Sequence, residues 1–256
     1  AFEFVVPVRH STTRLVAEVA EGLPAGTETL LDTPDRIEQL GDKAAFGKLA
    51  VDVGIPTPET YYPDETGIES IQREAEFPVV VKPTNASGAR GIRRVERSEE
   101  LPAVYRAAKR EAGEVIVQEF VDHSGGHYSI GTIFDERAEP VATHVYRETR
   151  QYPDSGGPAI AAHTVGREPW VDSMLDLLRD HDWKGPAHMD VLYDPDTEAH
   201  RLIEVNPRFW SSLSLTISSG VDIPYIMYKM AVDGVVPRSE AEYREGMTYR
   251  WVVPNE

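Results

Sequence analysis

The pattern of hydrophobic and polar residues divides the chain into strands and helices in a mixed order. Largely apolar runs over residues 78–82 and 115–121 predict buried strands. Alternating apolar and polar residues over 128–134 and 141–146 predict an antiparallel pair of strands. Apolar residues spaced three and four apart predict a helix over residues 170–179.

An alanine-rich segment over residues 41–53 predicts a helix. It should end before the prolines at 56 and 58, because proline cannot continue a helix. Residues 55–61 must therefore run extended. The remaining expected elements are a strand end at 4–8, a helix at 13–21, a short strand at 27–31, a strand at 92–95, a helix at 99–111, strands at 186–193 and 201–205, and a helix at 223–232.

The composition excludes several classes of protein. The chain has 256 residues and 41% hydrophobic content, enough for one large domain or two small ones. It has no run of about 18 or more apolar residues and no signal-peptide pattern, so we expect no membrane partner and a cytoplasmic location. It has no cysteine, which excludes disulfides, thiolate catalysis and cysteine-ligated zinc or iron–sulfur centres.

The charge balance is strongly acidic. Asp and Glu number 43 against 26 Lys and Arg, which gives a formal net charge of −17, and only six of the basic residues are lysines. Salt screens such self-repulsion, since the Debye length falls to roughly 3 Å at 1 M. This composition resembles that of proteins from halophilic archaea; the alternative is an ordinary acidic cytosolic protein. Neither favours a nucleic-acid partner, because the phosphate backbone would be repelled.

Two oxygen-bearing side chains lie two residues apart at the end of the predicted strand over 201–205. Glu204 and Asn206 therefore project from one face, and Asp190 on the preceding strand supplies a third oxygen if the two strands pair. Such oxygens suit Mg²⁺, or Mn²⁺ in its place, completed by water and nucleotide phosphates. Arg208, just beyond, would face a phosphate or carboxylate held there.

Lys82 ends an apolar strand and precedes a glycine-containing loop over residues 85–91. A phosphate group binds well to a cation beside backbone amides. The loop lacks a Walker A motif and leads into a strand, so it would cover phosphates as a hairpin flap; taken alone, it is more typical of a surface hairpin. Glu119 and Val121 end the next strand, where they could bind adenine; the alternative is a hydrogen-bonded strand end.

In their order and spacing these segments resemble the ATP-grasp superfamily over most of the chain. The matching motifs are Asp42-Lys43, Phe77-Pro-Val-Val-Val-Lys-Pro83, Ser87-Gly-Ala-Arg-Gly-Ile92, Val117-Gln-Glu-Phe-Val121, Asp190 and Glu204-Val-Asn-Pro-Arg208. Within the superfamily, residues 147–165, 204–210 and 220–224 look like those of the predicted carboxylate-amine ligases related to the large subunit of carbamoyl-phosphate synthase.

The resemblance implies an α+β (α/β) ATP-grasp fold in which two α+β lobes clamp ATP. It implies a partial pre-ATP-grasp, Rossmann-like segment over 1–41, a small lobe with linker helix and phosphate flap over 42–121, and a C-terminal lobe with the metal site over 122–256. The first segment resembles only the second half of a nucleotide-binding domain, and the chain lacks an initiating Met. We therefore expect a fragment or a processed form.

The resemblance also implies roles for individual residues in phosphate, adenine, ribose and metal binding. The residues that would contact the nucleotide are Lys43, Lys82, Ser87, Gly88, Gly91, Glu119, Val121 and His127. The residues that would bind one or two Mg²⁺ ions are Asp190, Glu204 and Asn206. The residues that would stabilise the transferred phosphoryl group or grip the acceptor carboxylate are Arg208, Lys82, Arg147 and Arg150.

His127 departs from the family pattern, because many relatives have a glutamate before the Tyr-Ser pair. Its contact with ribose is therefore open, and His123 and Asp122 are alternatives. His181 and His188 lack a His-Glu-x-x-His pattern, so we interpret them as packing or surface residues.

The implied reaction is an ATP-dependent, ADP-forming ligation. A substrate carboxylate attacks the γ-phosphorus to give an acyl phosphate, and an amine then displaces phosphate to form an amide-type bond. The partners would be a small carboxylate and a small amine, and the sequence leaves a homodimer open. The alternatives are a carbamoyl-phosphate synthase-like or kinase-type ATP-grasp enzyme, and a non-catalytic nucleotide-binding module.

Overall fold

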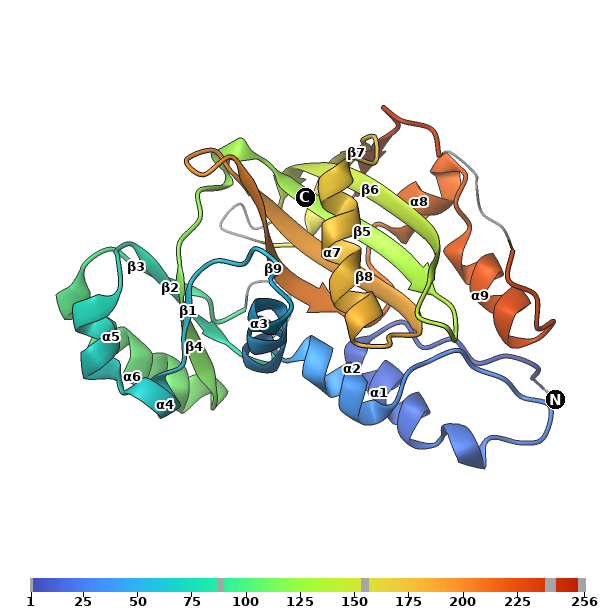
Figure 1. The fold of residues 1–256 in the computed structure, drawn as a ribbon, viewed down its shortest axis with the longest axis horizontal. Coiled ribbons are helices and arrows are strands. Elements are labelled where there is room, and N and C mark those ends of the chain that lie inside the picture. The colour runs from blue at the N-terminus through green and yellow to red at the C-terminus, as the bar shows by residue number, and fades with distance from the viewer. Residues whose placement is uncertain (1, 87–89, 153–156, 238–242, 253–256) are drawn as a thin grey trace.

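The computed structural model describes residues 2–86, 90–152, 157–237 and 243–252. In it the chain forms two antiparallel sheets that lie in separate lobes (Figure 1). None of the helices in the described part of the chain has both the length and the apolar character needed to cross a membrane.

The smaller sheet has the strand order β1-β4-β2-β3. Its strands are β1 (Thr60–Tyr61), β2 (Val79–Pro83), β3 (Arg93–Val95) and β4 (Val115–Glu119). The helices of this lobe are α4 (Pro63–Thr66), α5 (Ile68–Glu74) and α6 (Leu101–Ala112). Alternation along β2 separates its side chains: Val79 and Val81 share a core with α5 and α6, whereas Val80 and Lys82 face away from it.

The larger sheet has the strand order β10-β7-β6-β5-β8-β9. Its strands are β5 (His127–Phe134), β6 (Pro140–Gln151), β7 (Ala159–Thr164), β8 (Gly185–Asp194), β9 (Ala199–Asn206) and β10 (Thr248–Arg250). The predicted antiparallel pair is confirmed, because β5 pairs with β6 along its whole length.

Helices cover both faces of the larger sheet (Figure 1). One face packs against α2 (Pro34–Gly41), α3 (Lys43–Asp52) and α7 (Pro169–Asp180). The other packs against α8 (Leu213–Ser219) and α9 (Ile223–Ala231). The remaining helical elements are α1 (His10–Glu18) and the 3₁₀ turns η1 (Ala20–Gly22), η2 (Ser98–Glu100) and η3 (His123–Gly125).

Most predicted elements are present with slightly shifted ends, but the two strands expected near the start are wrong. Over residues 4–8 and 27–31 the described backbone forms an isolated parallel bridge between Phe4 and Glu28. Pro7 has no N–H to donate to a ladder, which limits pairing there. The sequence pattern did not predict α2, α4, α5, α8, β7 or β10. The proposed domain boundaries at 41 and 121 stay a prediction.

Candidate functional site

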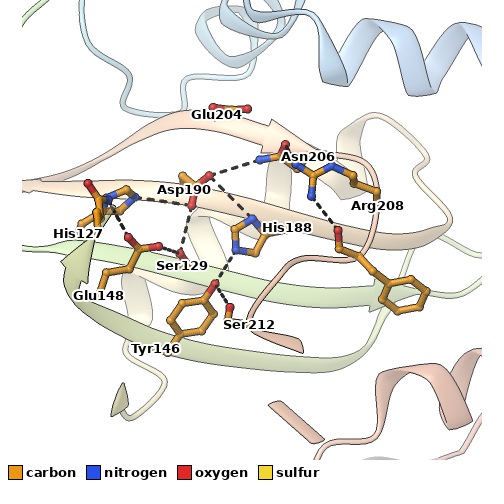
Figure 2. A network of polar contacts seen from close by, with 12 residues as sticks. His127, Ser129, Tyr146, Glu148, His188, Asp190, Glu204, Asn206, Arg208 and Ser212 are labelled. Atoms are coloured by element: carbon orange, nitrogen blue, oxygen red, sulfur yellow. Dashed lines mark hydrogen bonds and ion pairs between the residues drawn. The ribbon is translucent and has the colours of Figure 1, made fainter. Parts of the chain in front are cut away.

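Four neighbouring strands bring the candidate site residues onto one face of the larger sheet. The antiparallel register pairs Glu148 with His127, Ser129 with Asp190, and Asp190 with Glu204. Paired residues on antiparallel strands point to the same face, so these side chains converge from β6, β5, β8 and β9 (Figure 2). The predicted pairing of the Asp190 strand with the Glu204 strand is confirmed.

This face forms one wall of a cleft of about 600 Å³ between the two sheets. The smaller sheet contributes Val80, Lys82 and Gln118 to the opposite wall, and the larger sheet contributes Asp190 and Glu204. The volume is in the range of small-molecule sites. The two lobes therefore enclose a space suited to a ligand of nucleotide size.

Two lysines reach this cleft from different elements. Asp42 Oδ1 accepts hydrogen bonds from two backbone amides of α3 at 2.9 Å, and this cap places Lys43 in the first turn. Lys43 Nζ lies 3.4 Å from Glu204 Oε1. Lys82 Nζ donates to Gln118 Oε1 at 2.6 Å. The cleft thus holds two ammonium groups beside the predicted metal ligands.

The ammonium of Lys82 is destabilised in the free protein. Its pKa is lowered from 10.5 to about 8, mainly by burial and then by the positive charge of Lys43, while the carboxylate of Glu204 opposes the shift. A bound polyanion would relieve this destabilisation, because it supplies negative charge beside both lysines.

Asn206 connects the predicted metal ligand Asp190 to the guanidinium of Arg208. Its Nδ2 donates to Asp190 Oδ2 at 3.3 Å, and its Oδ1 accepts from Arg208 Nη2 at 2.7 Å. An amide oxygen has two lone pairs, so Asn206 Oδ1 can accept from Arg208 and also coordinate a cation. The oxygens of Asp190, Glu204 and Asn206 therefore form a donor set that fits Mg²⁺.

A buried hydrogen-bond chain leads to His188, which lies beside Asp190 (Figure 2). Ser212 Oγ donates to Tyr146 OH at 2.7 Å, and Tyr146 OH lies 2.9 Å from His188 Nε2. Burial lowers the pKa of His188 to about 4, so the ring is neutral at pH 7 and Nε2 accepts the tyrosine proton. Its Nδ1–H then faces Asp190 Oδ2 at 3.8 Å. The interpretation of His188 as a packing residue is confirmed, because it is buried and stacks on Tyr146 and Trp210, and it also lines the cleft.

Glu148 lies beside Asp190 on the same face. Ser129 Oγ is 3.1 Å from both Glu148 Oε1 and Asp190 Oδ1. Burial raises the pKa of Glu148 above its usual range, although His127 opposes the shift. Burial alone would raise the pKa of Asp190, but His188 and His127 hold it below its usual range. Asp190 is therefore the stronger anion of the two.

The strand end predicted to hold adenine lies on the cleft wall, but its carboxylate is already engaged. Glu119 Oε2 accepts from Glu59 N at 3.0 Å and forms an ion pair with Arg201 Nη1 at 2.5 Å. Arg201 Nη2 also pairs with Asp194 Oδ2 at 2.8 Å, so it links β4 to the larger sheet. An adenine contact through Glu119 Oε2 would have to displace Arg201. Val121 is buried on the same wall.

The predicted flap and ribose residues are placed as follows. Ser87 and Gly88 lie outside the described residues. Gly91 has a φ of +78°, a conformation that favours glycine, and a Cβ there would lie 2.8 Å from the Pro83 ring. For ribose, His127 and Asp122 both line the cleft.

The predicted acceptor-gripping arginines are not brought to the metal ligands. Arg147 and Arg150 line a second hollow of about 470 Å³ and are absent from the lining of the main cleft within the described residues. Alternation along β6 turns Tyr146 and Glu148 toward the cleft and therefore turns Arg147 away. Arg147 lies over the ring of Tyr128, 5.7 Å from its centre.

The sequence reasoning missed two residues that line the cleft, Tyr146 and Glu148, and two that contact lining residues, Ser129 beside Asp190 and Arg201 beside Glu119. Polar residues within otherwise apolar strand patterns mark Ser129 and Glu148 as unusual. For Tyr146 and Arg201 no local pattern distinguishes a cleft residue from a core or surface residue.

The match to a known family covers the elements that build this cleft. The family model described as an ATP-grasp domain matches residues 40–212, which include Lys43, Lys82 and the three predicted metal ligands. The chain belongs to the ATP-grasp family. The predicted family and the predicted α+β fold are confirmed. The expected halophilic origin stays a prediction.

Known proteins with similar sequence or structure agree with the ATP-grasp fold. The C-terminal section of the carbamoyl phosphate synthase large chain of Methanopyrus kandleri is 25% identical over 236 residues, covering 87% of this chain and 42% of that protein. A biotin carboxylase complex from Campylobacter jejuni has a TM-score of 0.79 at 16% identity, covering 96% of this chain and 58% of that one. The L-amino acid ligase of Bacillus licheniformis has a TM-score of 0.68 at 18% identity, covering 96% and 60%. The chain spans less than half of the length of its curated relatives, and 19% of a pyruvate carboxylase.

Proposed function

We propose that the chain forms the nucleotide site of an ADP-forming, Mg²⁺-dependent ligase, which activates a substrate carboxylate as an acyl phosphate for attack by an amine. The observation that carries the proposal is a single cleft lined by Lys43, Lys82, Asp190, Glu204 and Asn206, in which Lys43 Nζ lies 3.4 Å from Glu204 Oε1. Cations beside hard oxygen donors suit a polyphosphate and its metal ion. The structural similarity to an L-amino acid ligase supports an amine as the acceptor.

The basic residues would neutralise the phosphate oxygens. With a pKa of about 8, Lys82 is mostly protonated at pH 7, and a phosphate beside it would raise that pKa. Arg208 is held by two hydrogen bonds, to Asn206 Oδ1 at 2.7 Å and to Phe209 O at 2.8 Å. Its guanidinium is thus already oriented before a ligand binds, which favours stabilisation of the transferred phosphoryl group.

Asp190, Glu204 and Asn206 would hold Mg²⁺, with Mn²⁺ as a substitute. When bound, the ion polarises phosphoryl oxygens and offsets their charge. The hydrogen bonds from Ser212 to Tyr146 and between Tyr146 and His188 orient the His188 ring beside the Asp190 carboxylate.

In the proposed reaction, a carboxylate oxygen of the substrate forms a bond to the γ-phosphorus as the bond to the β,γ-bridging oxygen breaks. ADP leaves, and the substrate becomes an acyl phosphate. The amine nitrogen then attacks the acyl carbon, the bond from that carbon to the phosphate oxygen breaks, and the nitrogen loses a proton. The side chains of the cleft align the reactants and neutralise charge, so the protein supplies no covalent nucleophile.

Two lysines on α3 provide a matched test of the nucleotide site. Lys43 reaches the cleft, whereas Lys48 forms an ion pair with Glu65 and does not line it. Lys43→Gln should weaken Mg-ATP binding about tenfold or more, since a hydrogen bond to a charged group contributes about 1.5–3 kcal/mol. Lys48→Gln should leave the affinity unchanged. Isothermal titration calorimetry in concentrated KCl measures both, and equal losses in the two variants would contradict the assignment.

The ligase chemistry is tested by ADP release. A panel of amino acids and small carboxylates, each with and without an amine, should contain a pair that stimulates ADP release, and Glu204→Gln should abolish this turnover while the fold is retained. A Glu204→Gln variant with full activity would remove that residue from the metal site. ADP release that requires the carboxylate but is not stimulated by any amine would instead favour the kinase-type alternative.

A further inference from the structure

A cluster of nitrogen and oxygen ligands lies beside the predicted Mg²⁺ ligands and includes residues that the ATP-grasp motifs do not use. His127, Glu148 and Asp190 each present one ligand atom, and these atoms lie within 4.8 Å of one another. They come from the neighbouring strands β5, β6 and β8 (Figure 2). We propose that this cluster, together with the hydroxyl of Ser129, binds a divalent transition-metal ion in addition to the Mg²⁺ that accompanies the nucleotide, with Asp190 shared between the two ions.

The separations within the cluster are close to those around a shared metal ion. One ligand atom from each of His127, Glu148 and Asp190 lies within 4.8 Å of the other two, and His127 Nε2 lies 3.6 Å from Asp190 Oδ1. A direct charge-assisted hydrogen bond would be shorter, about 2.7–2.9 Å. Ligands about 2.1 Å from a tetrahedral or octahedral ion lie roughly 3.0–3.5 Å apart. The 3.1 Å distances from Ser129 Oγ to both carboxylates also fit that spacing.

The charge of the cluster favours a cation. The side chains of Glu148 and Asp190 are 6% and 17% exposed. In the part of the chain that the structure describes, their ion-pair partners are histidines, with no lysine or arginine among them. The hydroxyl of Ser129 has one proton to offer two carboxylate oxygens. Histidines compensate these buried carboxylates only when they are protonated, so an ion between the carboxylates would be bound favourably.

Gln151 contacts the side of His127 that faces Glu148. Its side-chain amide donates to Glu148 Oε2 at 2.7 Å and lies 2.5 Å from His127 Nδ1. The other ring nitrogen, Nε2, faces Asp190 Oδ1 and is therefore the nitrogen that would coordinate the ion.

The ligand set indicates the kind of metal. Mg²⁺ prefers oxygen ligands, whereas an imidazole nitrogen with two carboxylates suits a first-row transition metal such as Mn²⁺ or Zn²⁺. Mn²⁺ without nucleotide is the probe of choice, because pulsed electron paramagnetic resonance detects a coordinated ¹⁴N nucleus directly. The nucleotide is left out, so that the measurement is independent of ATP binding.

The experiment measures Mn²⁺ affinity and ¹⁴N coupling in excess Mg²⁺. The unmodified protein should bind one Mn²⁺ with ¹⁴N coupling. Glu148→Gln, which preserves side-chain shape, should raise the Kd for Mn²⁺ about tenfold or more. His127→Gln should remove the ¹⁴N coupling. His181→Gln, a matched substitution outside the cluster, should change neither, and circular dichroism confirms that each variant is folded.

Two results would overturn the proposal. One is a ¹⁴N coupling that persists in His127→Gln, which would assign the nitrogen to another residue such as His188. The other is an Mn²⁺ affinity that Glu148→Gln leaves unchanged. Glu204→Gln separates this site from the nucleotide site: it should keep the ¹⁴N-coupled Mn²⁺ while losing turnover. If the protein does not bind Mn²⁺ at this cluster, the comparison of Lys43→Gln with Lys48→Gln still tests Mg-ATP binding on its own.

Discussion

Lys82→Met should stabilise the free protein while abolishing Mg-ATP binding. The pKa of Lys82 is about 8 instead of 10.5, chiefly because of burial and then because of the charge of Lys43. The difference between these two pKa values means that the folded state disfavours the charged form by at most ~3 kcal/mol. Loss of the hydrogen bond to Gln118 offsets about 1 kcal/mol. We therefore expect a net gain of about 1–2 kcal/mol in the free energy of unfolding at pH 7.

The pH dependence of this gain in stability shows whether it comes from removing the charge of Lys82. The folded pKa of Lys82 lies below the unfolded one, so the destabilisation is fully present below pH 8 and is relieved as the pH rises toward 10.5. Thermal unfolding followed by circular dichroism should show a Tm higher by about 2–8 °C for Lys82→Met at pH 7, and nearly equal values near pH 10.5.

Lys48→Met is the matched control, because Lys48 lies outside the cleft in an ion pair with Glu65. It should show no gain that disappears at high pH. Saturating Mg-ATP should stabilise the unmodified protein and the Lys48 variant but not the Lys82 variant. A Lys82→Met protein that is less stable at pH 7, or a gain that is the same at both pH values, would refute the reasoning.

Three further outcomes follow from the packing and the charge. Gly131→Ala should lower the free energy of unfolding by about 1–3 kcal/mol in urea titrations, because a Cβ there collides with the ring of Trp210; an unchanged midpoint would contradict this close approach. Arg201→Gln should speed hydrogen exchange in the smaller sheet and spare α7, since it removes the ion pair with Glu119; protection that stays uniform would argue against a link between the lobes. Raising the KCl concentration toward 1 M should raise the Tm, because salt screens a net charge of −17, and a flat or falling Tm would exclude that effect.

The sequence by itself determined the local parts of the site. Alternation along a strand places Glu204 and Asn206 on one side without any knowledge of the fold, because side-chain direction in a strand follows from the backbone alone. The predicted helix over residues 41–53 likewise placed Lys43 in its first turn. The order of such segments along the chain was enough to identify the ATP-grasp family, confirmed by the match over residues 40–212.

Only the tertiary structure decided which face of each strand meets the cleft. Alternation shows that Arg147 and Glu148 point to opposite sides of the strand. The packing of the sheet determines that Glu148 lines the cleft and that Arg147 lines the second hollow instead. The meeting of His127, Glu148 and Asp190 depends on the register of three strands. Register is set by pairing between segments distant in the chain, and a shift of one residue would exchange the two faces. Local patterns therefore predicted the ATP-grasp motifs, and long-range pairing placed the acidic cluster beside them.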